Sequence, residues 1–327
     1  MSQIALFISR FQMPLPKDLT LLQTASEMYD GVLVLVSGAG RPCSVHAPLP
    51  NSYVQQTLQN VTAENVTVLP LLDTLYDDQT WVSHVRFCLE HFCNLQGFNA
   101  PQVTLMGQTS ENMRAMTGFF PDWSQGLVRE DTSNARLDAF WDNPQAHMPK
   151  SHQSRLTALI EYKDALETEH QRVQKAEEAL GYQIVFNTAD ALVTQSNHLL
   201  AFKREDGLFS LPGVHLQKDE RSVDAALRAA CKKANLNMPK GALSGRLKDR
   251  HTFDHPKRSE RGRVRTEVFH FDLPASGRME NVKGDNALWL PFHECTPDKF
   301  FEDHYDICQA LLRGVWCDQN ALLRDLN

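Results

Sequence analysis

Gly31-Val32-Leu33-Val34-Leu35-Val36 is a continuous apolar run rich in β-branched residues. Such a run is typical of a strand that is buried on both faces of a parallel sheet. Shorter runs of the same kind occur at residues 4–8, 66–69 and 102–105, and helical patterns such as residues 19–28 separate them. This alternation predicts a doubly wound, Rossmann-like α/β sheet with right-handed crossovers in the first half of the chain.

The second half has a different pattern. Residues 151–180 are charged, contain no glycine or proline, and predict a long helix that ends the first domain and leads to the second. The elements predicted beyond it are strands at 184–186, 191–194, 199–202, 264–273 and 287–290, a turn at 195–197, and helices at 223–234 and 300–323. We therefore predict one domain at residues 1–181, which includes the helical connector, and an α+β domain at residues 182–327.

The amino-acid composition limits the kinds of molecule that the chain is expected to bind. Hydrophobic residues make up 42% of the 327 residues and charged residues 22%, as in globular proteins. A net charge of −7 argues against a nucleic-acid partner, which needs a basic face. No signal peptide and no apolar stretch of the ~20 residues that a membrane helix needs is evident. Seven cysteines without framework spacing predict a reducing compartment, the cytoplasm.

One predicted helix contains a candidate site for a soft metal ion. His84, Cys88 and His91 fall at helical spacing and so share one face of a predicted helix. The same helix would also form by packing Val85, Phe87, Leu89 and Phe92 inward, with the small Cys88 as filler. We favour the packing interpretation, because three ligands on one helix rarely close a metal site without a fourth from elsewhere.

Several segments of the second domain form a recognisable series. They are Leu211-Pro212-Gly213, a helix containing Arg228, the run from Phe253 to Arg263, Trp289-Leu290-Pro291, and Phe300-Phe301-Glu302-Asp303-His304. Together they resemble the Nudix domain of the bifunctional nicotinamide mononucleotide (NMN) adenylyltransferase/ADP-ribose pyrophosphatase family. The resemblance spans nearly the whole domain. It implies a Nudix α/β/α sandwich in which helical carboxylates hold Mg²⁺ against a pyrophosphate, and the metal activates water.

The residues that should bind this metal have changed. Glu220 and Arg228 match the first Glu and the Arg of the motif, but its later Glu positions are Ala229, Lys232 and Lys233, and the second Gly of Leu-Pro-Gly-Gly is Val214. Ammonium groups repel Mg²⁺. We therefore expect metal-dependent hydrolysis to be lost or very weak, and Mg²⁺ to be a cofactor only if some Nudix activity remains.

The same changes allow a binding hypothesis. A lysine ammonium in place of the metal is able to neutralise a bound pyrophosphate, and arginines add bidentate contacts to phosphate oxygens. The residues expected to do so are Lys232, Lys233, Arg258, Arg261 and Arg263. The alternative is that the lysines form a solvated helix face and the arginines make structural ion pairs. Both interpretations remain open from the sequence.

In the first domain, too, residues of a binding motif have been replaced. Residues 9–19 resemble the nucleotidyltransferase signature of the same family, whose two histidines bind ATP phosphates at a helix N-terminus. These histidines are Leu15 and Asp18 here, whereas Arg10, Phe11 and Gln12 are retained. The second phosphate-binding signature appears as residues 131–136. The phosphate contacts implied by the resemblance are Arg10, Gln12, Thr132, Ser133 and Arg136, although Arg10 could instead anchor a loop and Thr132 or Ser133 could cap a helix.

Three functions follow from these observations. The first is a binding or regulatory protein for a nucleotide such as ADP-ribose, NAD or NMN, with catalysis impaired in both domains. The second is an active NMN adenylyltransferase or ADP-ribose pyrophosphatase. The third is a scaffold that assembles with itself, as a homo-oligomer, or with a protein partner. The loss of both sets of catalytic residues favours the first.

Overall fold

The computed structural model of the chain describes residues 1–107, 110–126, 133–275, 279–283 and 286–312. Its contacts divide the chain into two compact units, Met1–Ile160 and Glu161–Asn327. The division falls inside the long helix α7 (Gln153–Leu180), whose end precedes the domain boundary predicted at residue 181. No helix in the described part of the chain is long and apolar enough to cross a membrane.

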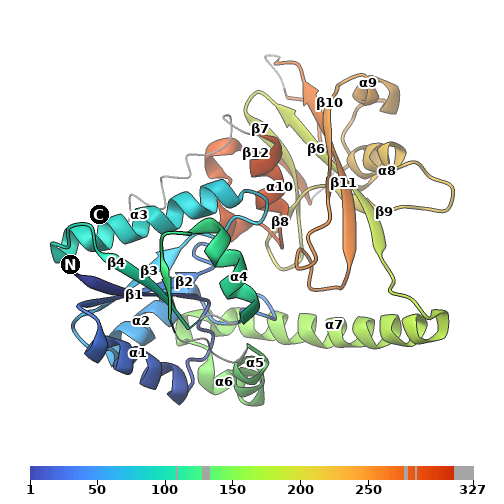
Figure 1. The fold of residues 1–327 in the computed structure, drawn as a ribbon. Coiled ribbons are helices and arrows are strands. Elements are labelled where there is room, and N and C mark those ends of the chain that lie inside the picture. Colours follow the sequence, from blue (N-terminus) through green and yellow to red (C-terminus); the bar gives the residue numbers. More distant parts are fainter. Residues whose placement is uncertain (108–109, 127–132, 276–278, 284–285, 313–327) are drawn as a thin grey trace. The chain divides into compact units, whose positions relative to one another are not determined.

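The first unit contains a parallel five-stranded sheet in the order β3-β2-β1-β4-β5 (Figure 1). Its strands are β1 (Gln3–Ser9), β2 (Gly31–Ser37), β3 (Val66–Leu71), β4 (Gln102–Met106) and β5 (Ser124–Gln125), and its helices are α1 (Pro16–Met28), α2 (Asn51–Val61), α3 (Asp78–Gln96), α4 (Ser110–Phe119), α5 (Ser133–Asp142) and α6 (Pro144–His147). Residues 32–36 of β2 are fully buried, as a strand covered on both faces requires. The predicted parallel α/β sheet is confirmed.

Helix α3 contains His84, Cys88 and His91, the candidate ligands of a soft-metal site. Val85, Cys88 and Phe92 are fully buried in the core, and the Cys88 thiol lies 3.7 Å from the carbonyl oxygen of Pro70. Among the described residues, no three His, Cys, Asp or Glu side chains are arranged to hold a metal. The prediction that Phe87 packs inward is wrong: it is 36% exposed and stacks on His91. Residues two apart on a helix face different sides, so Phe87 cannot share the face of Val85.

The second unit contains a mixed sheet in the order β10-β11-β6-β7-β12, to which β8 and β9 add at β7 and β6. Its strands are β6 (Phe186–Gln195), β7 (His198–Lys203), β8 (Phe209–Ser210), β9 (Gly213–His215), β10 (Leu247–Phe253), β11 (Val264–Leu273) and β12 (Ala287–Pro291), and its helices after α7 are α8 (Ser222–Arg228), α9 (Lys240–Ser244) and α10 (His304–Leu311). Strands β6 and β11 run parallel, and the other pairs are antiparallel. This is an α/β domain, as predicted.

Several predicted elements differ from the structure in detail. The strand predicted at 191–194 belongs to the longer strand β6, which begins at Phe186, so residues 184 and 185 of the other predicted strand lie outside it. The turn after it is confirmed, with Ser196 and Asn197 both at positive φ. Strand β10 was missed, because it is polar and exposed except at Phe253, as an edge strand is. The helix predicted at 223–234 is α8 followed by a π-helical turn, Ala229–Lys233. Of the helix predicted at 300–323, residues 313–323 lie outside the described part.

Candidate functional site

Strand β6 places a carboxylate inside the second unit. Ala189, Ala191 and Val193 pack in a core with residues of α8, and the alternation of a strand turns Asp190 to the other face. Asp190 is only 5% exposed. Neighbouring strand β9 approaches it so closely that a Cβ on Gly213 would lie 2.1 Å from the Asp190 Oδ1 atom. A glycine is therefore needed at this position.

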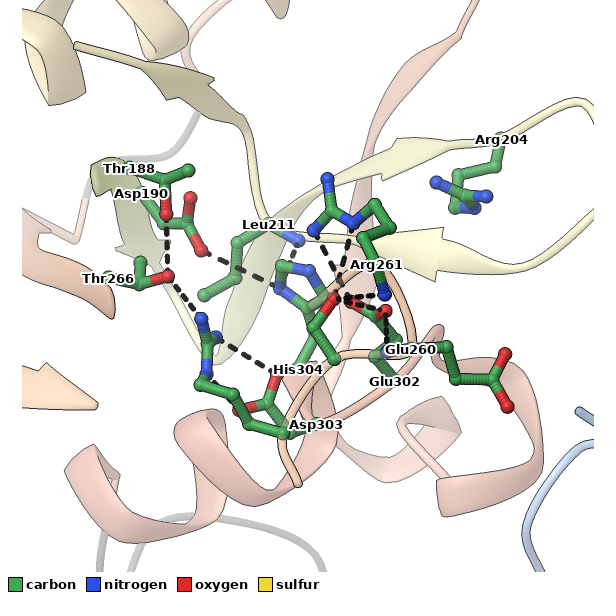
Figure 2. Close-up of polar contacts among 12 residues, drawn as sticks. Thr188, Asp190, Arg204, Leu211, Glu260, Arg261, Thr266, Glu302, Asp303 and His304 are labelled. Carbon is green, nitrogen blue, oxygen red and sulfur yellow. Dashed lines mark hydrogen bonds and ion pairs between the residues drawn. The ribbon is translucent and has the colours of Figure 1, made fainter. Parts of the chain in front are cut away.

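Asp190 lies beside a buried histidine at the start of α10. The Nδ1 atom of His304 is 3.9 Å from Asp190 Oδ2 and accepts a hydrogen bond from the Leu211 amide at 3.3 Å. Burial lowers the pKa of His304 well below its usual value, so the ring is neutral. Burial also raises the pKa of Asp190 to about 7, although Arg258 opposes the rise. His304 is therefore neutral, and Asp190, which lies beside it (Figure 2), is only partly ionised at neutral pH.

A buried ion pair holds the loop that follows β10 against the start of α10. Arg258 donates to both carboxylate oxygens of Asp303, with Nε to Oδ2 at 2.8 Å and Nη2 to Oδ1 at 3.0 Å. Its Nη1 donates to Thr266, whose hydroxyl lies 2.6 Å from that of Thr188 (Figure 2). Arg258 was predicted to bind phosphate. The structure places it 6% exposed in this structural network.

The Nudix-motif remnants Glu220 and Arg228 form a bidentate pair. Arg228 donates from Nε to Oε1 at 2.8 Å and from Nη2 to Oε2 at 2.7 Å, and Nη2 also bonds the His215 carbonyl at 2.9 Å. The hydrogen bonds from Arg228 and from the Gln217 amide lower the pKa of Glu220 to about 2. This carboxylate is ionised, and its oxygens already accept protein hydrogen bonds.

Lys233 ends the π-helical turn and reaches back to the sheet. Its ammonium donates to the carbonyl of Gly213 at 2.8 Å and lies 5.0 Å from the centroid of the Phe202 ring. Loss of water around the ammonium lowers the pKa of Lys233; Asp190 opposes this, and the charges of Arg204 and Arg261 add to it. Asp190, Arg204 and Arg261 therefore all lie within electrostatic range of Lys233. Lys233 and its neighbour Lys232 are both exposed residues.

The groups at the motif positions do not form a binding site for a divalent metal ion. Magnesium needs several convergent oxygen ligands. Of the motif positions, Glu220 is held by Arg228, Ala229 has no side-chain ligand atom, and the carbonyl of Gly213 accepts a hydrogen bond from Lys233.

Arg261 and Arg204 are the other cations of this region. Arg261 donates from Nε to the hydroxyl of Ser259 at 3.2 Å and lies 3.4 Å from a carboxylate oxygen of Glu302, with its side chain 41% exposed. The guanidinium of Arg204 lies 3.5 Å from the centroid of the Phe301 ring, close enough for a cation–π contact. The sequence analysis missed Arg204, because it belongs to none of the recognised segments.

The remaining predicted arginine of this unit, Arg263, is held by its own loop. Its Nη1 donates to the carbonyl of Asp254, and Nη2 lies 3.9 Å from a carboxylate oxygen of the same residue. Of the five residues predicted to bind phosphate here, the structure thus brings Lys233 and Arg261 into one region. Arg258 and Arg263 have intramolecular partners.

In the first unit, Asp18 and Arg136 form a buried ion pair. The other carboxylate oxygen of Asp18 accepts from the Leu15 amide at 2.8 Å, which caps the N-terminus of α1. Arg136 also lies over the Phe11 ring, 5.7 Å from its centroid. Asp18, at a position where the resemblance implies a phosphate-binding histidine, thus contacts the arginine that is itself predicted to bind phosphate.

The other predicted phosphate contacts of the first unit are less gathered. The Gln12 side chain is buried and exchanges hydrogen bonds with the backbone of Leu49, at 2.7 and 3.2 Å. Arg10 is exposed. Ser133 begins helix α5, and Thr132 lies outside the described residues.

The class of the second unit follows from comparison with known families. Residues 184–311 match the family model of the NUDIX domain. The second unit is therefore a Nudix domain.

Solved structures extend the likeness to both units. The bifunctional NMN adenylyltransferase/ADP ribose pyrophosphatase from Francisella tularensis is 22% identical, with a TM-score of 0.80 over 96% of this chain and 100% of its own. The same kind of protein from that organism, crystallised with AMP and a manganese ion, gives a TM-score of 0.77 at the same identity and coverage. At this level of identity the likeness establishes a shared fold.

Proposed function

We propose that this chain is a nucleotide-binding protein of NAD metabolism, whose Nudix unit binds ADP-ribose or a related NAD-type dinucleotide without metal-dependent cleavage. The observation that carries the proposal is the position of Lys233. Its ammonium bonds the Gly213 carbonyl from a helix position where the resemblance implies a metal-binding carboxylate. A fixed cation there supplies the positive charge for a pyrophosphate.

The surrounding charges support an anionic ligand. Arg204 and Arg261 share the region of Lys233, and each lowers the pKa of that lysine through its charge. Arg204 pairs with Asp206 at 3.0 Å and Arg261 lies 3.4 Å from Glu302, and a bound pyrophosphate would add a further anionic partner for these cations. Arg261 is partly exposed, so its guanidinium is accessible to a ligand.

The other predicted contacts have weaker support. Lys232 is exposed on the same turn and remains a proposed phosphate contact. Arg258 is buried in its pair with Asp303, and Arg263 is held within its own loop, so we assign both to structure. In the first unit, Arg10, Gln12, Thr132, Ser133 and Arg136 remain predictions. A cytoplasmic location and a nucleotide partner, rather than nucleic acid, are part of the same proposal.

Calorimetric titration of ADP-ribose in the presence of EDTA tests this function. The wild-type protein should bind, and Lys233→Met should raise the dissociation constant about tenfold or more, since a charge-assisted hydrogen bond contributes ~1.5–3 kcal/mol. Lys175→Met is the matched control, because Lys175 is exposed on α7. Absence of binding by the wild-type protein at millimolar ADP-ribose would refute the proposal. Magnesium-dependent release of AMP would instead identify an active pyrophosphatase.

A further inference from the structure

The guanidinium of Arg204 lies flat on the ring of Phe301. Its Cζ atom is 3.5 Å from the ring centroid. In an edge-on guanidinium, a nitrogen about 1.3 Å from Cζ would come closer to the ring than van der Waals contact allows, so the two planes are stacked. Phe301 is only 8% exposed, whereas the side chain of Arg204 is 30% exposed. Phe301 therefore covers one face of the guanidinium, and the solvent-accessible part of the stack belongs to Arg204.

A tight turn after β7 fixes the direction of this side chain. The Gly207 amide donates to the Arg204 carbonyl at 3.0 Å, and the Arg204 amide donates to the Leu208 carbonyl at 2.8 Å. The Asp206 carboxylate accepts from Arg204 Nε and from the Leu208 amide, both at 3.0 Å. In the described part of the chain, Asp206 and Phe301 are the only side chains that make a hydrogen bond, ion pair or ring contact with the guanidinium.

The stacked guanidinium lies next to the lysine that is proposed to bind the pyrophosphate. Arg204 continues strand β7, because its amide extends the ladder with β8, and its side chain is therefore on the same face as that of Phe202. The ammonium of Lys233 lies 5.0 Å from the centroid of the Phe202 ring. Residues two apart on a strand are separated by ~7 Å. Arg204 also stands apart from the polar network around Asp190 and His304 (Figure 2).

We propose that the outer face of the Arg204 guanidinium stacks against the adenine base of the bound nucleotide. This inference rests on the proposed function of the Nudix unit and assigns a base-binding residue to the same site. Nucleobases stack on planar guanidinium groups, and Arg204 is already held in one orientation. Because Asp206 balances its charge, its flat face is the feature that it offers a ligand. Adenine fits this cation better than nicotinamide does, since the nicotinamide ring of NAD and NMN is positively charged.

The Arg204→Lys variant tests this inference, because lysine keeps the charge and loses the planar face. Titrated with ADP-ribose in EDTA, it should have a dissociation constant about tenfold higher than the wild type, as the loss of base stacking predicts. Its affinity for inorganic pyrophosphate, which has no base, should equal that of the wild type. Arg250→Lys is the matched control and should bind ADP-ribose normally, because Arg250 is exposed on edge strand β10, which β11 and β6 separate from β7.

A second measurement needs only the wild-type protein. The ultraviolet absorbance of adenine should decrease when ADP-ribose binds, as it does when a base becomes stacked. Unchanged absorbance in the saturated complex would overturn the inference. So would equal ADP-ribose affinities of wild type and Arg204→Lys while Lys233→Met still binds more weakly, a result that leaves the proposed function intact.

The remaining outcomes separate charge from stacking. An equal loss of affinity for ADP-ribose and pyrophosphate in Arg204→Lys would show that Arg204 contacts a phosphate, and would contradict the stacking role. A wild-type protein that does not bind ADP-ribose would refute the proposed function, and this inference with it.

Discussion

Asp190 lies in surroundings that favour its neutral form. Its neighbour His304 already uses Nδ1 to accept the Leu211 amide, so that nitrogen offers no proton to the carboxylate. Arg258 lowers the pKa of Asp190, but burial outweighs it, and the nearby charge of Asp303 adds to the rise. Protonation of Asp190 is therefore coupled to folding.

The coupling has a definite sign. The pKa of Asp190 is about 7 in the folded chain and near 3.8 in the unfolded chain, so between these pH values the folded state binds the extra proton. The free energy of unfolding should therefore fall as pH rises from about 4 to 7. Asp190→Asn, which stays neutral, should gain stability relative to wild type over that range, by up to on the order of 4 kcal/mol at ~1.4 kcal/mol per pKa unit. Urea unfolding at several pH values measures this difference, and a difference independent of pH would contradict the assignment.

Sequence alone identified much of this chemistry at the level of single residues. Comparison with the motif is enough to predict that Ala229, Lys232 and Lys233 stand at carboxylate positions. Arg204 was not predicted, because an arginine after a strand carries no local signal.

Two short elements position the site, and each depends on a close approach. Strand β9 passes so near β6 that Gly213 has no room for a side chain beside Asp190, and the same glycine provides the carbonyl that Lys233 bonds. Lys233 is the last residue of the π-helical turn Ala229–Lys233. A π turn departs from the 3.6-residue period, so the direction of Lys233 was not predictable from a regular helix.

Gly213→Ala should therefore disturb both the Asp190 carboxylate and the hydrogen bond that Lys233 makes to residue 213. A Cβ 2.1 Å from Asp190 Oδ1 forces a shift of a buried side chain or of β9, and overpacking of this kind costs about 1–3 kcal/mol. Urea unfolding measures the loss, and ADP-ribose affinity should fall with it. Gly241→Ala in α9 is the matched control, since open space surrounds it, and it should leave stability equal or raise it by roughly 0.4–1 kcal/mol. Equal effects of the two changes would argue against the close approach.

Across the whole molecule, buried ion pairs join residues that lie far apart in the sequence. Asp18 and Arg136 are 118 positions apart, and Arg258 and Asp303 are 45 apart. Each pair lies within one unit, and all four side chains are at most 5% exposed. Such pairs stabilise a fold only as complete pairs, because the removal of one partner leaves a buried charge unpaired.

Asp303→Asn should accordingly cost about 3–5 kcal/mol of unfolding free energy, as the loss of one partner of a buried pair does. Arg172→Ala, which breaks an exposed pair with Glu169 on α7, should cost less than about 1 kcal/mol. Denaturant unfolding of both variants provides the comparison. Similar costs would mean that the Arg258–Asp303 pair contributes no more than a surface contact.

The order of strands and helices, the parallel sheet and the loss of metal-binding residues are encoded locally, in hydrophobic periodicity and in residue types at motif positions. Which cations face a shared region, and which are held by carboxylates elsewhere, depends on contacts between distant segments. Arg258 and Arg261 are three residues apart in one loop, yet one lies buried against Asp303 and the other is partly exposed. No local pattern specifies such partners, because the partner is chosen by the packing of elements remote in the sequence.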